Sequence, residues 1–163
     1  MSKAIFPGTF DPFTIGHEAI VKRTLTFMDE VVIAIVNNPE KHALFSVEER
    51  VRQISEVFKD EPRVSVISFE GATPDIALEV GAQAIIRGVR SVKDFEYEEN
   101  LAFIYKKMSD IETILLYTDP ELAFVSSSIV REMIKFGKDP SEFVPFKLKI
   151  ETFRSSECKA KLV

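Results

Sequence analysis

The sequence predicts an α/β fold in which a doubly wound, Rossmann-like sheet of five parallel strands carries helices on both faces. Three observations predict it: short apolar runs rich in β-branched residues recur five times, a helical pattern separates successive runs, and the connections are too long for hairpins. The 163 residues suit a single domain over 1–163 with one hydrophobic core.

The first half of the chain predicts three strands separated by two helices. Residues 17–28 have apolar side chains at helical spacing. Ser46 and Glu49 have the spacing of a capping box and open a second helix, whose apolar residues recur as far as Phe58. The strands are expected over 3–6, 30–37 and 63–69, and the continuous apolar run of the second is typical of a strand buried on both faces.

The second half continues the same alternation. Thr73 and Pro74 fit the N-cap and first position of a short helix that Gly81 ends. Asp94 is expected to cap a longer helix, and the serines of 126–128 are expected to open a further one. Strands are expected over 82–88 and 113–118. The buried face of the longer helix is expected to consist of Tyr97, Leu101, Ile104, Tyr105 and Met108.

Composition excludes several classes of protein. The formal net charge of −5 argues against a general nucleic-acid binder, which is usually basic. No apolar run reaches the roughly 18 residues of a membrane span, and Pro7 and Gly8 interrupt the first apolar run before it could serve as a signal peptide. The single cysteine, Cys158, cannot form an internal disulfide, which favours a reducing, cytoplasmic location. The tail 154–163 matches no pattern and is expected to be disordered.

Ligands of doubly wound sheets bind beyond the carboxyl ends of the strands, where the strand order reverses. Both histidines, one lysine and two arginines of this chain are expected at this rim: His17, His42, Lys41, Arg87 and Arg90. The sequence therefore predicts a cationic rim on an acidic protein, and a polyanion such as a nucleotide is the ligand that fits it.

The stretch FPGTFDPFTIGH, residues 6–17, lies on this rim between a strand and a helix. Thr14 fits the N-cap, so Gly16 and His17 fall in the first turn, where free N–H groups and the helix dipole attract an anion. Gly8 permits a close approach of the loop, and Thr9 offers a hydroxyl. An ordinary strand–turn–helix connection is the alternative, since glycine and proline are common in turns. The glycine-rich motifs of dinucleotide-binding dehydrogenases and of Walker ATPases do not occur.

The same stretch resembles the signature of the nucleotidylyltransferase superfamily, in which [H/T]-x-G-H follows the first strand. The preceding PGTFDP, Lys41 before FSVEER, IIRGVRSVKDFEYE (85–98) and VSSSIVRE (125–132) are similar to the bacterial phosphopantetheine adenylyltransferase family, over about residues 2–150. The resemblance implies transfer of AMP from ATP to 4′-phosphopantetheine, giving 3′-dephospho-CoA and pyrophosphate in coenzyme A biosynthesis. It also implies Mg²⁺ that enters with ATP and has no ligand from the protein, a homohexamer, and feedback inhibition by coenzyme A.

The resemblance further implies a role for each matching residue. The catalytic residues are expected to be His17, Thr9, Lys41 and Arg90, with His17 stabilising the transition state and Thr9 orienting the attacking phosphate. The ATP site is expected to comprise Thr9, Phe10, His17, Gly88, Val89, Arg90, Glu98, Leu122, Ala123, Phe124, Val125, Ser126, Ser127 and Ser128. The second substrate is expected to contact Thr9, Lys41, Thr73 and Arg87.

Some of these residues also have a purely structural interpretation. Glu98 suits the first turn of a helix, the serines suit an N-cap, and Lys41 suits a solvated loop. Thr73 and Leu122 depart from the residues usual in the family, so both pockets are expected to differ in detail. Two other functions stay open: nucleotidylyl transfer to another phosphate, such as nicotinate mononucleotide, and nucleotide binding without catalysis.

Overall fold

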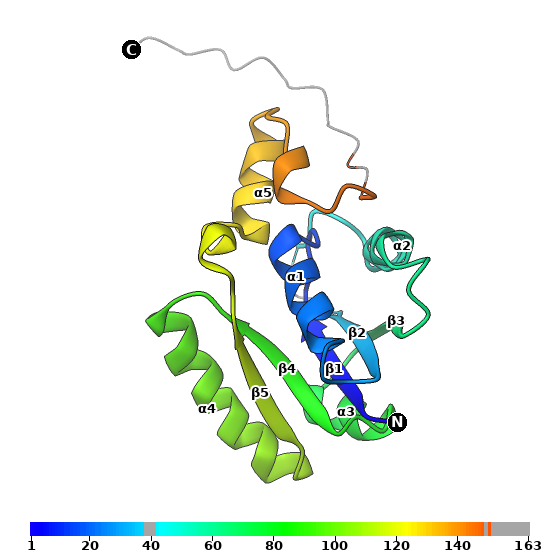
Figure 1. Cartoon of the computed structure of the whole chain (residues 1–163). Coiled ribbons are helices and arrows are strands. Elements are labelled where there is room, and N and C mark those ends of the chain that lie inside the picture. Colours follow the sequence, from blue (N-terminus) through cyan, green and yellow to red (C-terminus); the bar gives the residue numbers. More distant parts are fainter. Residues whose placement is uncertain (38–41, 149, 151–163) are drawn as a thin grey trace.

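The computed structural model of the chain describes residues 1–37, 42–148 and 150. Its five strands form one all-parallel sheet in the order β3-β2-β1-β4-β5 (Figure 1). They span β1 Lys3–Gly8, β2 Glu30–Val36, β3 Val64–Phe69, β4 Ala84–Val89 and β5 Glu112–Tyr117. The α/β, doubly wound fold class predicted from the sequence is therefore confirmed.

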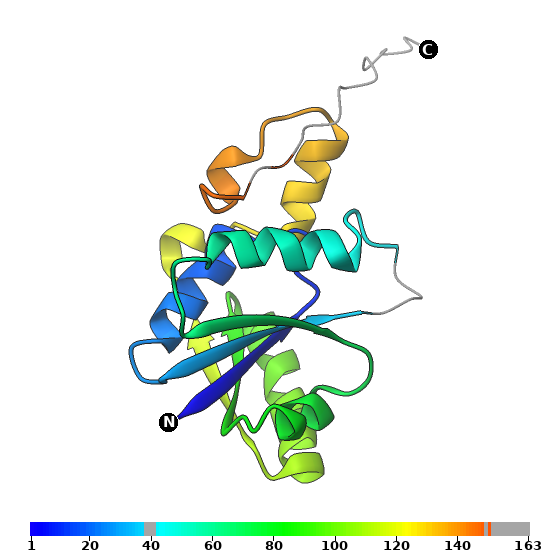
Figure 2. The ribbon, with the colours of Figure 1, turned by 90° about the vertical axis from the view of Figure 1, so that its right-hand side faces the viewer.

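Helices cover both faces of this sheet. The helices α1 (Ile15–Thr24) and α2 (Val47–Val57) lie on one face, and α3 (Thr73–Glu79) and α4 (Val92–Ser109) lie on the other (Figures 1 and 2). The helix α5 (Ser127–Lys135) stands beyond the carboxyl ends of the strands, flanked by the short 3₁₀ turns η1 (Pro120–Leu122) and η2 (Ser141–Phe143). Among the residues that the structure describes, no helix is long and apolar enough to cross a membrane.

The two faces of the central strands build two separate hydrophobic clusters. Alternate side chains of β1, such as Ala4 and Phe6, face the cluster under α1, α2 and α5, whereas Ile5 faces the cluster under α3. Ile33 and Ile86 are fully buried in the first cluster, as expected for strands covered on both sides.

The strand order reverses between β1 and β4, and these two strands separate towards their carboxyl ends. They pair only at Ala4–Ala84 and Ile5–Ile85, whereas β1 remains paired with β2 as far as Gly8. Pro7, which cannot donate to a strand ladder, lies where the pairing of β1 with β4 has ended. The resulting gap positions the candidate site.

Helix boundaries and one helix face differ from the sequence predictions. The first helix ends at Thr24 rather than at residue 28, Ala72 precedes Thr73 as the N-cap of α3, and Ser91 rather than Asp94 caps α4. The predicted buried face of α4 is only partly right, because three of its five residues are exposed: Tyr97, Ile104 and Met108. Leu101 and Tyr105 are half-buried, as predicted, and the one buried residue of α4 is Glu98, which pairs with Arg87 on β4.

Candidate active site

A pocket of about 310 Å³ opens at the carboxyl ends of β1 and β4, at the predicted reversal of strand order. The β1–α1 connection, the end of β4, the first turns of α1 and α4 and the start of α5 all contribute to its walls. Its lining consists of Phe6, Pro7, Gly8, Thr9, Phe10, Thr14, Gly16, His17, Ile20, Arg87, Gly88, Arg90, Asp94, Glu98, Thr118, Val125, Ser126, Ser127 and Ser128.

The first turn of α1 fixes the orientation of the His17 ring. The N-cap of α1 is Thr14, as predicted, and the His17 backbone N–H donates to its hydroxyl oxygen at 3.4 Å. In return, the Thr14 backbone N–H donates to His17 Nδ1 at 3.0 Å. Because Nδ1 accepts this hydrogen bond, the proton of the neutral imidazole is on Nε2. His17 is therefore a hydrogen-bond donor in the pocket wall.

The surroundings of His17 disfavour its charged form. Burial, together with the positive charges of Arg90 and Arg87, lowers the pKa of His17 from 6.5 to about 4. Phe10 and Phe13 pack against the ring, with centroids 5.1 and 5.3 Å from that of His17. The imidazole is therefore neutral at pH 7.

The loop before α1 has an unusual backbone at Phe10. Its φ of 50° lies in the left-handed region, which costs a residue with a side chain about 1–2 kcal/mol. The Phe10 ring folds back over Gly8, so that a Cβ added at Gly8 would lie 2.7 Å from a ring atom. Gly8 thus permits a close approach of the Phe10 ring, whereas the predicted approach of the loop to a ligand stays a prediction.

Two other glycines in the pocket wall have room for a side chain within the protein. A Cβ at Gly16 would meet its nearest neighbour, Thr14 Oγ1, at 3.6 Å, and one at Gly88 would meet Ile20 at 3.5 Å. Both are ordinary contacts. The missing side chains therefore widen the pocket beside the α1 N-terminus without being required for packing.

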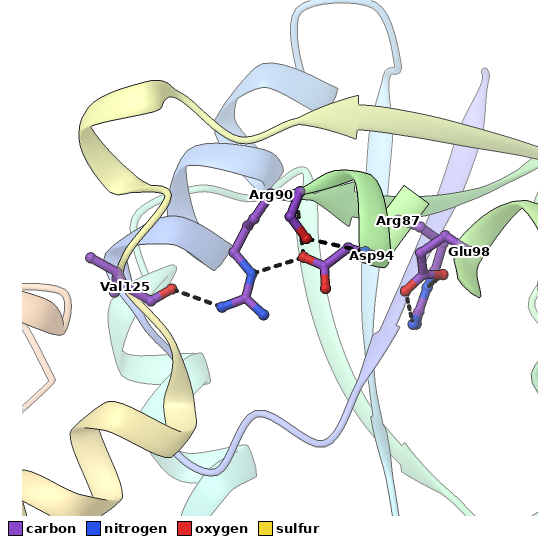
Figure 3. A network of polar contacts seen from close by, with 6 residues as sticks. Arg87, Arg90, Asp94, Glu98 and Val125 are labelled. Carbon is purple, nitrogen blue, oxygen red and sulfur yellow. Dashed lines mark hydrogen bonds and ion pairs between the residues drawn. The ribbon is translucent and has the colours of Figure 1, made fainter. Parts of the chain in front are cut away.

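Arg87 fills the gap between the separating strands. Its Nε and Nη2 each donate to a carboxylate oxygen of Glu98 at 2.6 Å (Figure 3). Its Nη1 donates to the Pro7 carbonyl at 3.0 Å. Burial alone would lower the pKa of Arg87, but the hydrogen bonds and the charge of Glu98 outweigh it, so that the pKa of Arg87 is raised. Arg87 therefore joins β4, α4 and β1 at the floor of the pocket.

Arg90 connects the opposite wall. Its Nε donates to Asp94 Oδ2 at 3.2 Å and its Nη1 to the Val125 carbonyl at 3.3 Å, so it links α4 to the segment before α5 (Figure 3). The expected arginines are thus present, but each is paired with a carboxylate. Among the described residues that line the pocket, two positive charges meet two negative ones, and the wall is balanced rather than cationic.

The serines form the N-terminus of α5, as predicted. Ser126 is the N-cap and accepts from the Ile129 N–H, while Ser127 and Ser128 lie in the first turn. The hydroxyl of Ser127 donates to the Pro12 carbonyl at 2.8 Å, which ties α5 to the loop before α1. Two helix N-termini therefore face one pocket, and both can bind an anion through backbone N–H groups.

Most of the sequence-predicted site residues meet in this pocket, but several do not. Lys41 lies outside the described residues, as does the tail 154–163. Thr73 of α3 is not part of the pocket wall, and neither are Val89, Leu122, Ala123 and Phe124. Asp94 and Thr118 line the pocket although neither is among the predicted site residues. The spacing of Asp94 from Arg90, four residues along a predicted helix start, was a usable signal.

Comparisons with known proteins show which family the sequence resembles. Residues 5–133 match the model of the family described as cytidylyltransferase-like. The chain is 59% identical over 145 residues to a phosphopantetheine adenylyltransferase of Bacteroides fragilis, covering 89% of this chain and 97% of that protein. It is 56% identical over 151 residues to that of Phocaeicola vulgatus, covering 93% and 100%. It is 47% identical over 146 residues to that of Caldanaerobacter subterraneus, covering 89% and 91%.

Proposed function

Because the chain belongs to the cytidylyltransferase-like family and, within it, to the phosphopantetheine adenylyltransferases, we propose that it transfers AMP from ATP to 4′-phosphopantetheine. The products are 3′-dephospho-CoA and pyrophosphate, in coenzyme A biosynthesis. The observation that carries the proposal is the convergence of two helix N-termini, a neutral histidine donor and two arginines on one pocket. Its volume of about 310 Å³ is within the range of small-molecule sites.

The reaction requires the protein to position the two substrates and to stabilise the charge of the transition state. A phosphate oxygen of 4′-phosphopantetheine attacks the α-phosphorus of ATP, and the bond from that phosphorus to the bridging oxygen breaks, so pyrophosphate leaves with the electron pair. No covalent intermediate on the enzyme is required. Catalysis then consists of bringing two anions together and stabilising the charge that develops on the α-phosphate.

His17 and Thr9 are the residues that we assign to the reacting centre. The neutral His17 ring would donate from Nε2 to an oxygen of the α-phosphate, and the fixed Nδ1 contact holds the ring in the donating tautomer. Thr9 is exposed at the pocket, where its hydroxyl would orient the attacking phosphate. Gly16 leaves space at the α1 N-terminus for a phosphoryl group.

The arginines and α5 would hold the rest of the two substrates. The three contacts of Arg87 use three of its five N–H donors and leave two for the phosphate of 4′-phosphopantetheine. Arg90 and the α5 N-terminus at Ser126 would bind the phosphates of ATP. Lys41, which lies outside the described residues, keeps its proposed role in stabilising phosphate charge.

Mg²⁺ is the metal that we expect to accompany ATP. The two carboxylates of the pocket, Asp94 and Glu98, are each engaged with an arginine. The donors that suit the ion are therefore oxygens of the ATP phosphates and water, as is common for Mg²⁺. Bound there, the ion would neutralise part of the charge of the leaving pyrophosphate.

The proposal is tested by measuring pyrophosphate release from ATP and Mg²⁺ in three reactions: with 4′-phosphopantetheine, without an acceptor, and with nicotinate mononucleotide. Release only with 4′-phosphopantetheine is expected. Release only with the mononucleotide would show that the proposed substrate is wrong. No release from protein that binds ATP would favour nucleotide binding without catalysis.

His17→Ala is expected to lower kcat by more than about 100-fold, because one donor to a developing oxyanion is worth about 3 kcal/mol. His42→Ala, which changes the exposed second histidine, is the matched control.

We further propose a homohexamer that coenzyme A inhibits. Exposed apolar side chains on α4 and β5 support assembly, because a monomer rarely exposes so many together: Val92, Tyr97, Phe103, Ile104, Met108 and Tyr117. The molar mass in solution tests the assembly, and a mass of one chain would refute it.

Coenzyme A contains both the pantetheine part and the adenylyl part of the product, so its inhibition is expected to be competitive with 4′-phosphopantetheine.

A further inference from the structure

The loop between β1 and α1 is held by side chains from other parts of the chain. The Thr9 carbonyl accepts from Arg50 Nη1 of α2 at 2.7 Å, and the Asp11 carbonyl accepts from Arg131 Nη1 of α5 at 2.7 Å. With the contact of Ser127 to Pro12, three carbonyls within four residues are bound by side chains of α2 and α5. Regular strand or helix hydrogen bonds do not hold this segment.

The Asp11 side chain is connected to Arg50 through the backbone of Phe45. Its two carboxylate oxygens accept the backbone N–H groups of Leu44 and Phe45 at 2.8 and 2.9 Å. The Phe45 carbonyl in turn accepts from Arg50 Nε at 3.1 Å. Asp11 and Arg50 are each only 3% exposed, although neither is a ligand-facing group in the proposed mechanism. A charged side chain is rarely buried so deeply unless its contacts are satisfied.

The residue between these two anchored carbonyls is the one with the strained backbone. Phe10, at φ 50°, persists in the left-handed region only if its surroundings fix it. The ring of Phe10 packs on His17, and the residue before it is Thr9. Any relaxation of Phe10 would therefore move the two groups that we assign to the reacting centre.

We propose that Arg50 and Asp11 are positioning residues for the adenylyl transfer: they hold the loop of residues 9–11 in the conformation that presents Thr9 and supports His17. This inference rests on the proposed function. Arg50 is not among the residues that line the pocket, so it acts on the reaction through the Thr9 carbonyl and not by touching substrate.

The first test is steady-state kinetics of Arg50→Met, which keeps the apolar stem and removes the donors. A fall in kcat of about 10- to 100-fold is expected, because a misplacement of about 1 Å costs about that much. KM for ATP is expected to change less than about threefold, since the pocket arginines and the α5 N-terminus remain. Asp11→Asn, which turns one accepting oxygen into a donor facing a donor, is expected to lower kcat in the same way.

Ile54→Ala provides the control for a loss of stability. Ile54 is fully buried in the same helix α2, one turn beyond Arg50, and is not among the residues that line the pocket. Its melting temperature is expected to fall at least as far as that of Arg50→Met while kcat stays near the wild-type value. If equal destabilisation produced an equal loss of kcat, Arg50 would be a structural residue and the inference would be wrong.

A double-mutant cycle with Thr9→Ala decides whether Arg50 acts through Thr9. If it does, the double variant loses less kcat than the product of the two single losses, because the loss of the positioned Thr9 hydroxyl is common to both variants. Independent effects that multiply would overturn the inference. The activity of the wild-type protein distinguishes a failure of the proposed function from a failure of the positioning role. If the wild type has no activity towards 4′-phosphopantetheine, the proposed function is wrong. If the wild type is active and Arg50→Met has the same kcat, only the positioning role is refuted.

Discussion

Acidification should destabilise this protein through His17. The folded protein holds the pKa of His17 at about 4, against 6.5 for an exposed histidine, so the unfolded chain binds a proton first as the pH falls. The stabilising contribution is fully present above pH 6.5 and is lost between pH 6.5 and about 4. The difference corresponds to about 3 kcal/mol in total, of which about 2 kcal/mol is lost between pH 7 and pH 5.

His17→Gln isolates this effect from the titration of the carboxylates. Glutamine at the third helical position preserves the capping box with Thr14 but carries no titratable group. We expect urea unfolding at pH 7 and pH 5 to show a loss for the wild type that exceeds the loss for the variant by about 2 kcal/mol.

An NMR titration gives the same quantity directly. His42→Gln removes the other histidine of the chain, so that the remaining imidazole signal belongs to His17. The signal should stay that of a neutral ring, protonated on Nε2, down to about pH 5. The reasoning would be refuted if the free energies of unfolding of wild type and His17→Gln fell equally with pH, or if the NMR titration of His17 had its midpoint near pH 6.5.

Three substitutions test other parts of the pocket. Gly8→Ala should lower the free energy of unfolding by about 1–3 kcal/mol in urea titrations, because its Cβ would overlap the Phe10 ring; an unchanged stability would contradict the close approach. Gly16→Ala should stabilise the helix by up to about 1 kcal/mol yet lower kcat/KM for ATP at least about tenfold, and unchanged kinetics would remove the phosphate from the α1 N-terminus. Glu98→Gln should cost about 2 kcal/mol in the same urea titrations, because Arg87 loses the charge of its bidentate partner, and a neutral effect would show that the pair is replaceable.

The fold and much of the site follow from local patterns in the sequence. The alternation of apolar runs and helical segments predicts the sheet, and the rule for carboxyl ends predicts the pocket at β1 and β4. The spacing of Thr14 and His17 predicts the helix start, because capping depends on residues three positions apart.

The features of the structure that the sequence does not predict depend on contacts between residues far apart in the chain. The hydrophobic pattern of α4 predicts only part of its buried face, since it does not reveal that Glu98 turns inward to pair with Arg87. The role of Arg50 is hidden for the same reason, since its partner is the Thr9 carbonyl, 41 positions earlier. Backbone acceptors have no side-chain identity that a sequence could reveal.

The separation of β1 from β4 bears on how the chain folds during synthesis. Of the five strands, β1 is made first, yet it lies between β2 and β4. Its second edge has no partner until residue 84 has been added, a delay of about 4–15 s at ribosomal rates. An open strand edge invites pairing with other chains, and proline on such an edge opposes it. Pro7 would therefore protect the nascent chain during this delay, at the same position where the finished enzyme opens its pocket.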